Sequence, residues 1–129
     1  MTGVKKYWNE EMETLSSEEY VKAQEKSFLR ELDYVWQNSQ FYQEKFGREG
    51  IELGDIKGIG DLEKLPFTEK HEIRESLNVA PPLGKHAAVD IGQVIRVYST
   101  SGTTGNPTYI GLTLHDRDVW RETAMRAMW

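Results

Sequence analysis

The chain of 129 residues contains no cysteine. This absence excludes a disulfide framework, a thiolate nucleophile and any metal site built on cysteine. No apolar run approaches the roughly 20 residues that a membrane-spanning helix needs. Lys5 and Lys6 are not followed by the apolar stretch of a secretory signal. The sequence therefore predicts a cytoplasmic protein that has no membrane partner.

Basic residues are fewer than acidic ones. The chain has 16 Lys and Arg and 21 Asp and Glu, which gives a net charge of −5. The chain has no basic stripe, so no nucleic-acid partner is expected. His71, His86 and His115 lie far apart and lack metal-ligand spacing, and structural or solvated roles are predicted for them. The length fits one ordinary domain.

The first half of the chain is predicted to be mainly helical. After an irregular arm over residues 1–15, Ser16 begins a helix that runs to about Gln37, because Ser16 and Glu19 fit a capping box and apolar residues recur at helical spacing. Further expectations are a short helix ending near Gly47, a loop over 50–60, a turn from Asp61 to Leu65, a helix over 69–76 capped by Thr68, and an extended connector over 78–92.

The second half is predicted to hold a strand–loop–strand unit over about 94–112. A last helix should begin at Thr113 or His115. A lone hairpin is marginal in water, so this unit is expected to leave apolar surface exposed where further strands would lie. The residues expected to form the buried face of the last helix are Val119, Trp120, Thr123, Ala127 and Met128.

The loop between the two strands is the most informative feature. Ser99 to Gly105 carries five hydroxyls and two glycines in seven residues. Glycines let the backbone approach a polyanion closely, while amides and hydroxyls donate hydrogen bonds to it. Such a composition is also typical of a solvated turn. Nucleotide phosphate is nevertheless the first ligand to consider.

The loop matches neither of two common phosphate-binding motifs. A Walker A loop needs Gly-x-x-x-x-Gly-Lys-[Ser/Thr], whereas Gly102 and Gly105 are too close and Asn106-Pro107 follows them. The loop does not fit the dinucleotide fingerprint either, because it contains no Gly-x-Gly.

The order Ser-Thr-Ser-Gly-Thr-Thr-Gly-Asn-Pro-Thr over 99–108 resembles the phosphate-binding signature of the adenylate-forming enzymes. Further stretches resemble phenylacetate-CoA ligases in the family's order: 7–13, 38–42, 62–70 and 111–120. The resemblance implies an α+β or α/β fragment, the helix-rich N-terminal part of the large domain, with one strand–phosphate-loop–strand unit. On this reading residues 1–129 are a truncated large domain, and the small C-terminal domain is absent.

The resemblance also implies a reaction. The carboxylate of an aromatic acid attacks the α-phosphate of ATP, pyrophosphate leaves, and coenzyme A then displaces AMP to give a thioester. ATP would be accompanied by Mg²⁺. Relatives are often dimers, so the resemblance allows a homodimer and leaves the oligomeric state open. The residues implied to bind the ATP phosphates are Ser99, Thr100, Ser101, Gly102, Thr103, Thr104 and Gly105, with Pro107 and Thr108 at the loop exit.

Two departures from the family pattern limit the prediction. Asn106 stands where many relatives have lysine, which would weaken the attraction for pyrophosphate. The chain also lacks counterparts of the adenine motif, the ribose-binding aspartate, the hinge and the C-terminal lysine, so no catalytic residue is expected within it and the chain alone should be inactive. Two alternatives remain open: a non-catalytic nucleotide-binding or interaction module, and a split subunit completed by a partner chain.

Overall fold

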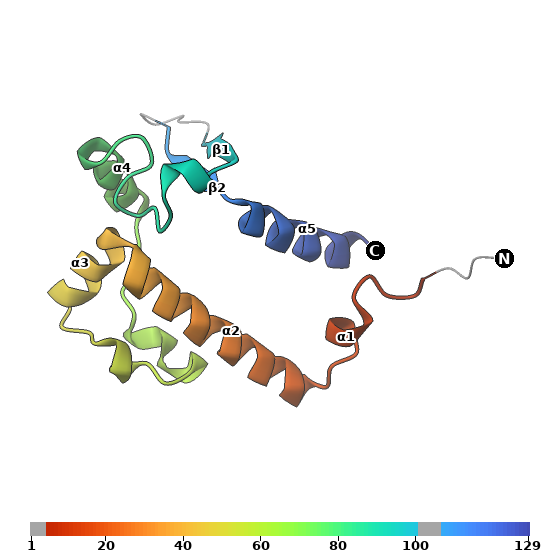
Figure 1. The fold of residues 1–129 in the computed structure, drawn as a ribbon. Coiled ribbons are helices and arrows are strands. Elements are labelled where there is room, and N and C mark those ends of the chain that lie inside the picture. The colour runs from red at the N-terminus through yellow and green to blue at the C-terminus, as the bar shows by residue number, and fades with distance from the viewer. Residues whose placement is uncertain (1–4, 101–106) are drawn as a thin grey trace.

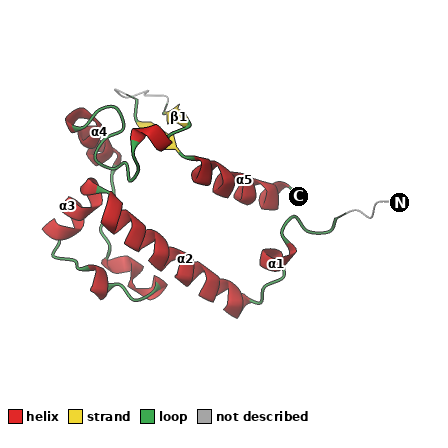
Figure 2. Cartoon of the chain, viewed as in Figure 1, coloured by secondary structure: helices red, strands yellow, loops and turns green. Residues whose placement is uncertain are grey.

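The computed structural model describes residues 5–100 and 107–129, which form a helix-rich fold with a two-stranded sheet (Figures 1 and 2). The helices are α1 (Glu10–Glu13), α2 (Ser17–Asn38), α3 (Gln40–Arg48), α4 (Lys70–Val79) and α5 (Leu114–Met128). The strands are β1 (Arg96–Ser99) and β2 (Tyr109–Leu112). Short 3-10 helices are η1 (Leu53–Asp55), η2 (Ile59–Lys64) and η3 (Ile91–Gln93).

The long helix α2 begins with the predicted capping box. Glu19 N–H donates to Ser16 Oγ at 3.3 Å, and Ser16 N–H donates to Glu19 Oε2 at 2.9 Å. These bonds satisfy two backbone donors that the first helical turn leaves free. The hydrogen bonds from Ser16 lower the pKa of Glu19. The helix ends at Asn38, one residue beyond the predicted Gln37, so this prediction is confirmed.

The main core lies where α2 meets α3 and the 3-10 segments. Leu32, Phe46 and Ile56 are buried together. The ring of Phe46 stacks on Trp36 with centroids 5.4 Å apart. The apolar side chains packed around this centre are Phe28, Leu29, Trp36, Tyr42, Ile51, Leu53 and Leu65. The predicted amphipathic role of α2 is therefore confirmed.

A second junction ties α3 to α4 and to the connector before the hairpin. Ser39 is fully buried and its hydroxyl donates to the backbone carbonyls of Lys85 and His86, at 3.4 and 3.3 Å. Lys45, which is 5% exposed, forms an ion pair with Glu72 of α4. Hydrogen bonds to Glu72 from the Glu69 backbone and from Lys45 lower its pKa. These polar contacts join α3 to α4 and to the connector that leads to the hairpin.

The N-terminal arm is more ordered than the sequence predicts. Within residues 1–15, where an irregular arm is expected, α1 forms because the Asn9 side-chain oxygen accepts a hydrogen bond from Met12 N–H at 3.1 Å. The prediction of an irregular arm is wrong for these four residues of α1. A single helical turn gives no periodic apolar pattern, so its only signal was the Asn9 cap.

The segment 50–60 is also more regular than expected. Asp55 Oδ2 accepts the backbone N–H of Glu52 at 2.9 Å, and Asp61 Oδ2 accepts that of Lys57 at 2.8 Å. These carboxylates hold the short turns of η1 and η2. The expected loop is therefore corrected to two 3-10 helices, the second covering the turn predicted near Asp61.

Helix α4 begins and ends later than predicted. Glu69 rather than Thr68 precedes the helix, and Glu69 N–H donates to Glu72 Oε2 at 2.8 Å. The helix continues to Val79 instead of ending at Ser76, so the first two residues of the expected connector over 78–92 are helical. The rest of that connector contains turns and η3, and is not uniformly extended.

Helix α5 follows β2 and begins as predicted, with Thr113 as its cap. Asp116 N–H donates to Thr113 Oγ1 at 3.2 Å, and Thr113 N–H donates back to Asp116 Oδ2 at 2.7 Å. Its predicted buried face is wrong, because no residue of α5 is buried. The residues expected on that face are all exposed: Val119, Trp120, Thr123, Ala127 and Met128.

Candidate functional site at the ends of the predicted phosphate loop

The hairpin carries the predicted phosphate site. β1 and β2 pair antiparallel, with Arg96 opposite Leu112 and Ser99 opposite Tyr109, which confirms the predicted strand–loop–strand unit. The structure places Ser99 and Thr100 where the loop leaves β1, and Pro107 and Thr108 where it rejoins β2. The other predicted site residues lie outside the described residues: Ser101, Gly102, Thr103, Thr104 and Gly105, together with Asn106.

A reciprocal pair of hydrogen bonds joins the two ends of the loop. Thr100 N–H donates to the Thr108 carbonyl at 3.0 Å, and Thr108 N–H donates to Thr100 Oγ1 at 3.1 Å. A regular antiparallel ladder would use a backbone carbonyl for the second bond. Here a side-chain hydroxyl takes that place. We refer to Thr100 and Thr108 with these two bonds as the threonine clasp.

Thr108 lies inside the fold although it belongs to a loop exit. It is 5% exposed, and its hydroxyl oxygen has no hydrogen-bond partner among the described residues. Pro107 precedes it and has no N–H of its own, so the first backbone donor after the loop is that of Thr108. The burial leaves this N–H dependent on a protein acceptor, which Thr100 supplies.

His86, in the connector before the hairpin, contacts helix α4. Its Nδ1 lies 3.1 Å from Ser76 Oγ of α4, and its backbone N–H donates to the same oxygen at 3.1 Å. The imidazole also lies near the backbone of Tyr109, the residue next to Thr108. The predicted structural role of His86 is confirmed by these contacts. Sequence patterning gave no signal that ties it to the loop exit.

Burial of the imidazole lowers the pKa of His86 below 6.5, and the nearby Tyr109 backbone opposes this only in part. The folded chain therefore favours neutral His86. Its contribution to stability is complete above pH 6.5 and is lost as the pH falls below that value. Carboxylates with a lowered pKa, such as Glu72, affect the pH dependence of stability in a separate range, below pH 4.5.

We expect the free energy of unfolding to decrease as the pH falls below 6.5, and His86→Gln to remove the part of the decrease that begins there. Urea unfolding at a series of pH values measures the slope. His115→Gln, at an exposed position of α5, is the matched control and should retain the wild-type slope. Equal slopes in all three proteins would contradict the assignment to His86.

The hairpin is flanked by two apolar hollows. On the face toward α5, Tyr98 meets Trp120 edge to face with centroids 5.3 Å apart, in a groove that Leu112 also lines. On the other face, Val97 and Tyr109 line a second hollow together with Pro81, Pro82, Leu83, Ile91 and Pro107. Both strands of the hairpin keep exposed apolar side chains, so the predicted open apolar surface is confirmed.

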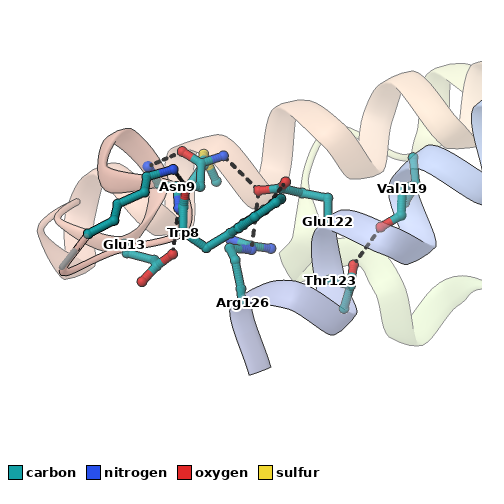
Figure 3. A network of polar contacts seen from close by, with 9 residues as sticks. Trp8, Asn9, Glu13, Val119, Glu122, Thr123 and Arg126 are labelled. Carbon is teal, nitrogen blue, oxygen red and sulfur yellow. Dashed lines mark hydrogen bonds and ion pairs between the residues drawn. The ribbon is translucent and has the colours of Figure 1, made fainter. Parts of the chain in front are cut away.

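The position of α5 is fixed by the N-terminal arm (Figure 3). Glu122 accepts hydrogen bonds from Trp8 Nε1 at 2.8 Å and from Asn9 Nδ2 at 2.7 Å. These bonds, that from Asn9 first, lower the pKa of Glu122. Trp129 Nε1 donates to the Lys5 carbonyl at 3.0 Å, and its ring lies 5.7 Å from that of Trp8. The two ends of the described chain thus hold the helix that follows the hairpin.

Neither a metal-ligand cluster nor a bilayer-spanning helix is present among the described residues. Over residues 5–100 and 107–129, no group of three or more histidine, aspartate or glutamate side chains could hold a metal ion. Within the same residues, no helix combines the length and the apolar character that crossing a bilayer requires.

Known proteins that resemble this chain are acid–CoA ligases. No family model matches it. The phenylacetate-CoA ligase of Thermus thermophilus is 35% identical over 92% of the chain, and that of Escherichia coli K12 is 32% identical over 91%. The Aromatoleum evansii enzyme is 37% identical over 74%. The chain spans about a quarter of the length of these curated relatives, 20–26%.

Solved structures agree with the sequence comparison. A 2-hydroxyisobutyryl-CoA ligase with 2-HIB-AMP and CoA superposes on 95% of the chain with a TM-score of 0.86 and 31% identity. Another structure of that enzyme, with R3-HIB-AMP, covers the whole chain with a TM-score of 0.87 and 27% identity. In each case the chain covers 26–27% of the solved protein.

The fold is thus the helix-rich N-terminal part of an adenylate-forming ligase, which confirms the predicted fold class. The hairpin with its hydroxyl-rich loop belongs to that part. Within this class, the chain belongs to the phenylacetate-CoA ligase family and corresponds to an N-terminal segment of it.

Proposed function

We propose that residues 1–129 form the N-terminal portion of the large domain of an ATP-dependent aryl-carboxylate:CoA ligase, with Ser99 to Gly105 as its phosphate loop. The observation that carries the proposal is the 32–37% identity with phenylacetate-CoA ligases, which extends over up to 92% of the chain. The matching hairpin, which presents the two ends of the loop side by side, supports the same assignment.

The proposed reaction has two steps. A carboxylate oxygen of the acid forms a bond to the α-phosphorus of ATP, and the bond between the α-phosphorus and the oxygen bridging to the β-phosphate breaks to release pyrophosphate. The thiol sulfur of coenzyme A then bonds to the acyl carbon, and AMP leaves with the electron pair of the carbon–oxygen bond. The partners of the complete protein would be an aromatic carboxylate, ATP and coenzyme A.

The loop contributes positioning and charge stabilisation to the first step. Negative charge grows on pyrophosphate as it leaves, and fixed donors directed at that charge lower the barrier. Backbone amides made accessible by Gly102 and Gly105, with the hydroxyls of the loop, suit that task. Mg²⁺ would be held mainly by phosphate oxygens, as is usual for nucleotides.

ATP–pyrophosphate exchange that depends on an aromatic acid tests the proposal. The assay compares this chain with the complete ligase that contains it, and we expect exchange only in the complete ligase. There, Thr104→Val should lower the exchange rate about 100-fold, the effect of losing a donor to developing charge. Gly102→Leu should lower it by about the same factor, because the leucine side chain would block the close approach of the backbone to phosphate. Gly60→Leu and Thr123→Val are matched controls, because both residues are exposed and an added Cβ at Gly60 meets nothing within 4 Å.

Each other outcome contradicts a defined part of the proposal. Unchanged exchange in Gly102→Leu and Thr104→Val would remove the phosphate role from the loop. Complete absence of exchange in the longer protein would favour a nucleotide-binding or interaction module. Exchange that appears only when a second chain is added would favour a split subunit.

A further inference from the structure

The threonine clasp joins the two ends of the predicted phosphate loop. Its backbone half, Thr100 N–H to the Thr108 carbonyl at 3.0 Å, continues the pairing of β1 with β2 by one step beyond Ser99 and Tyr109. Its side-chain half, Thr108 N–H to Thr100 Oγ1 at 3.1 Å, has no counterpart in a regular ladder.

The side-chain half cannot be replaced by water. Thr108 is 5% exposed, so its N–H has little access to solvent. Pro107 offers no N–H that could take over, and it fixes φ just before the clasp. A buried backbone donor that loses its acceptor is strongly unfavourable, so removal of the Thr100 hydroxyl should displace the backbone at the loop exit.

The geometry assigns to Thr100 the part of a positioning residue, whose side-chain oxygen sets the spacing of the two loop ends through the Thr108 amide. The inference rests on the proposed function, and it refines the expectation that every hydroxyl from Ser99 to Thr104 contacts phosphate. Thr100 Oγ1 accepts the bond from Thr108 N–H, so the Thr100 side chain is held across the two ends of the loop.

Two measurements on the same variants test this inference. Thr100→Val removes the hydroxyl but keeps the shape, and Thr100→Ser keeps the hydroxyl. In this chain without nucleotide, hydrogen exchange of the Thr108 amide followed by NMR should become at least about tenfold faster in Thr100→Val, as expected for the loss of one hydrogen bond. Thr100→Ser should retain the wild-type exchange rate.

In the complete ligase, Thr100→Val should raise KM for ATP about tenfold while KM for the aromatic acid stays unchanged. Thr100→Ser should restore KM for ATP to within about threefold of wild type. Thr123→Val, at an exposed position of α5 away from the hairpin, is the matched control and should leave both constants unchanged.

Three results would overturn the inference. An unchanged Thr108 amide in Thr100→Val, with a raised KM for ATP, would make Thr100 a direct phosphate ligand. A lower melting temperature with KM for ATP unchanged would make its role purely structural. A Thr100→Ser variant that behaves like Thr100→Val would exclude the hydroxyl. A wild-type ligase without exchange activity would instead defeat the proposed function, and the amide measurement would still decide for or against the clasp.

Discussion

Gly84→Ala is expected to destabilise the chain by about 2–5 kcal/mol, the sum of about 1–2 kcal/mol for a left-handed backbone and about 1–3 kcal/mol for overpacking. Gly84 has φ of +79°. A Cβ there would lie 2.6 Å from His86 Nδ1 and 2.8 Å from Ser76 Oγ, so both partners of that hydrogen bond would have to move. Urea unfolding of the chain measures the effect.

Two other glycines separate the backbone part of this effect from the packing part. Gly50 also has a positive φ, +67°, but a Cβ there meets nothing within 4 Å, so Gly50→Ala should cost only about 1–2 kcal/mol. Gly60 has neither constraint, and Gly60→Ala should change the stability by less than about 0.5 kcal/mol. If Gly84→Ala lowers the free energy of unfolding no more than Gly50→Ala does, His86 and Ser76 move aside freely.

The consequence of Gly84→Ala should reach the candidate site. Displacement of His86 would change its position relative to the Tyr109 backbone, one residue from the threonine clasp. Gly84 thus connects a turn before the hairpin to the exit of the predicted phosphate loop. This connection joins segments about 25 residues apart, and no periodic pattern in the sequence encodes it.

Features with local causes were predictable from the sequence. The Ser16–Glu19 capping box and the Thr113 cap each depend on residues three positions apart, so the beginnings of α2 and α5 could be predicted. The hairpin could also be predicted, because two β-branched runs enclose a loop of small residues. The shift of the α4 cap from Thr68 to Glu69 is a competition between neighbouring caps that local patterning does not decide.

Features that depend on distant partners were not predictable. The exposed side chains of α5, such as Trp120, have the composition of a buried face, but burial is decided by what packs against the helix. The relatives are about four times as long as this chain. The sequence also could not show which loop hydroxyl accepts the bond from Thr108 N–H, since Ser99, Thr100 and Ser101 have the same hydrogen-bonding chemistry.

Phe46→Ala is expected to cost about 3–5 kcal/mol, the usual range for removing a buried phenyl ring. Phe46 is 3% exposed, stacks on Trp36 at 5.4 Å and contacts Tyr42 with centroids 5.6 Å apart. Its removal opens a cavity beside Leu32 and Ile56, the other buried members of this core. Urea unfolding followed by near-ultraviolet circular dichroism measures the loss, because Trp36 would lose its aromatic neighbour.

Phe67 provides the matched control for Phe46. It is 95% exposed, so Phe67→Ala should change the stability by less than about 0.5 kcal/mol. Phe46→Leu keeps most of the volume and should cost about 1.5 kcal/mol, which keeps the test decisive where Phe46→Ala fails to fold. A loss below about 1 kcal/mol in Phe46→Ala would mean that the cavity collapses.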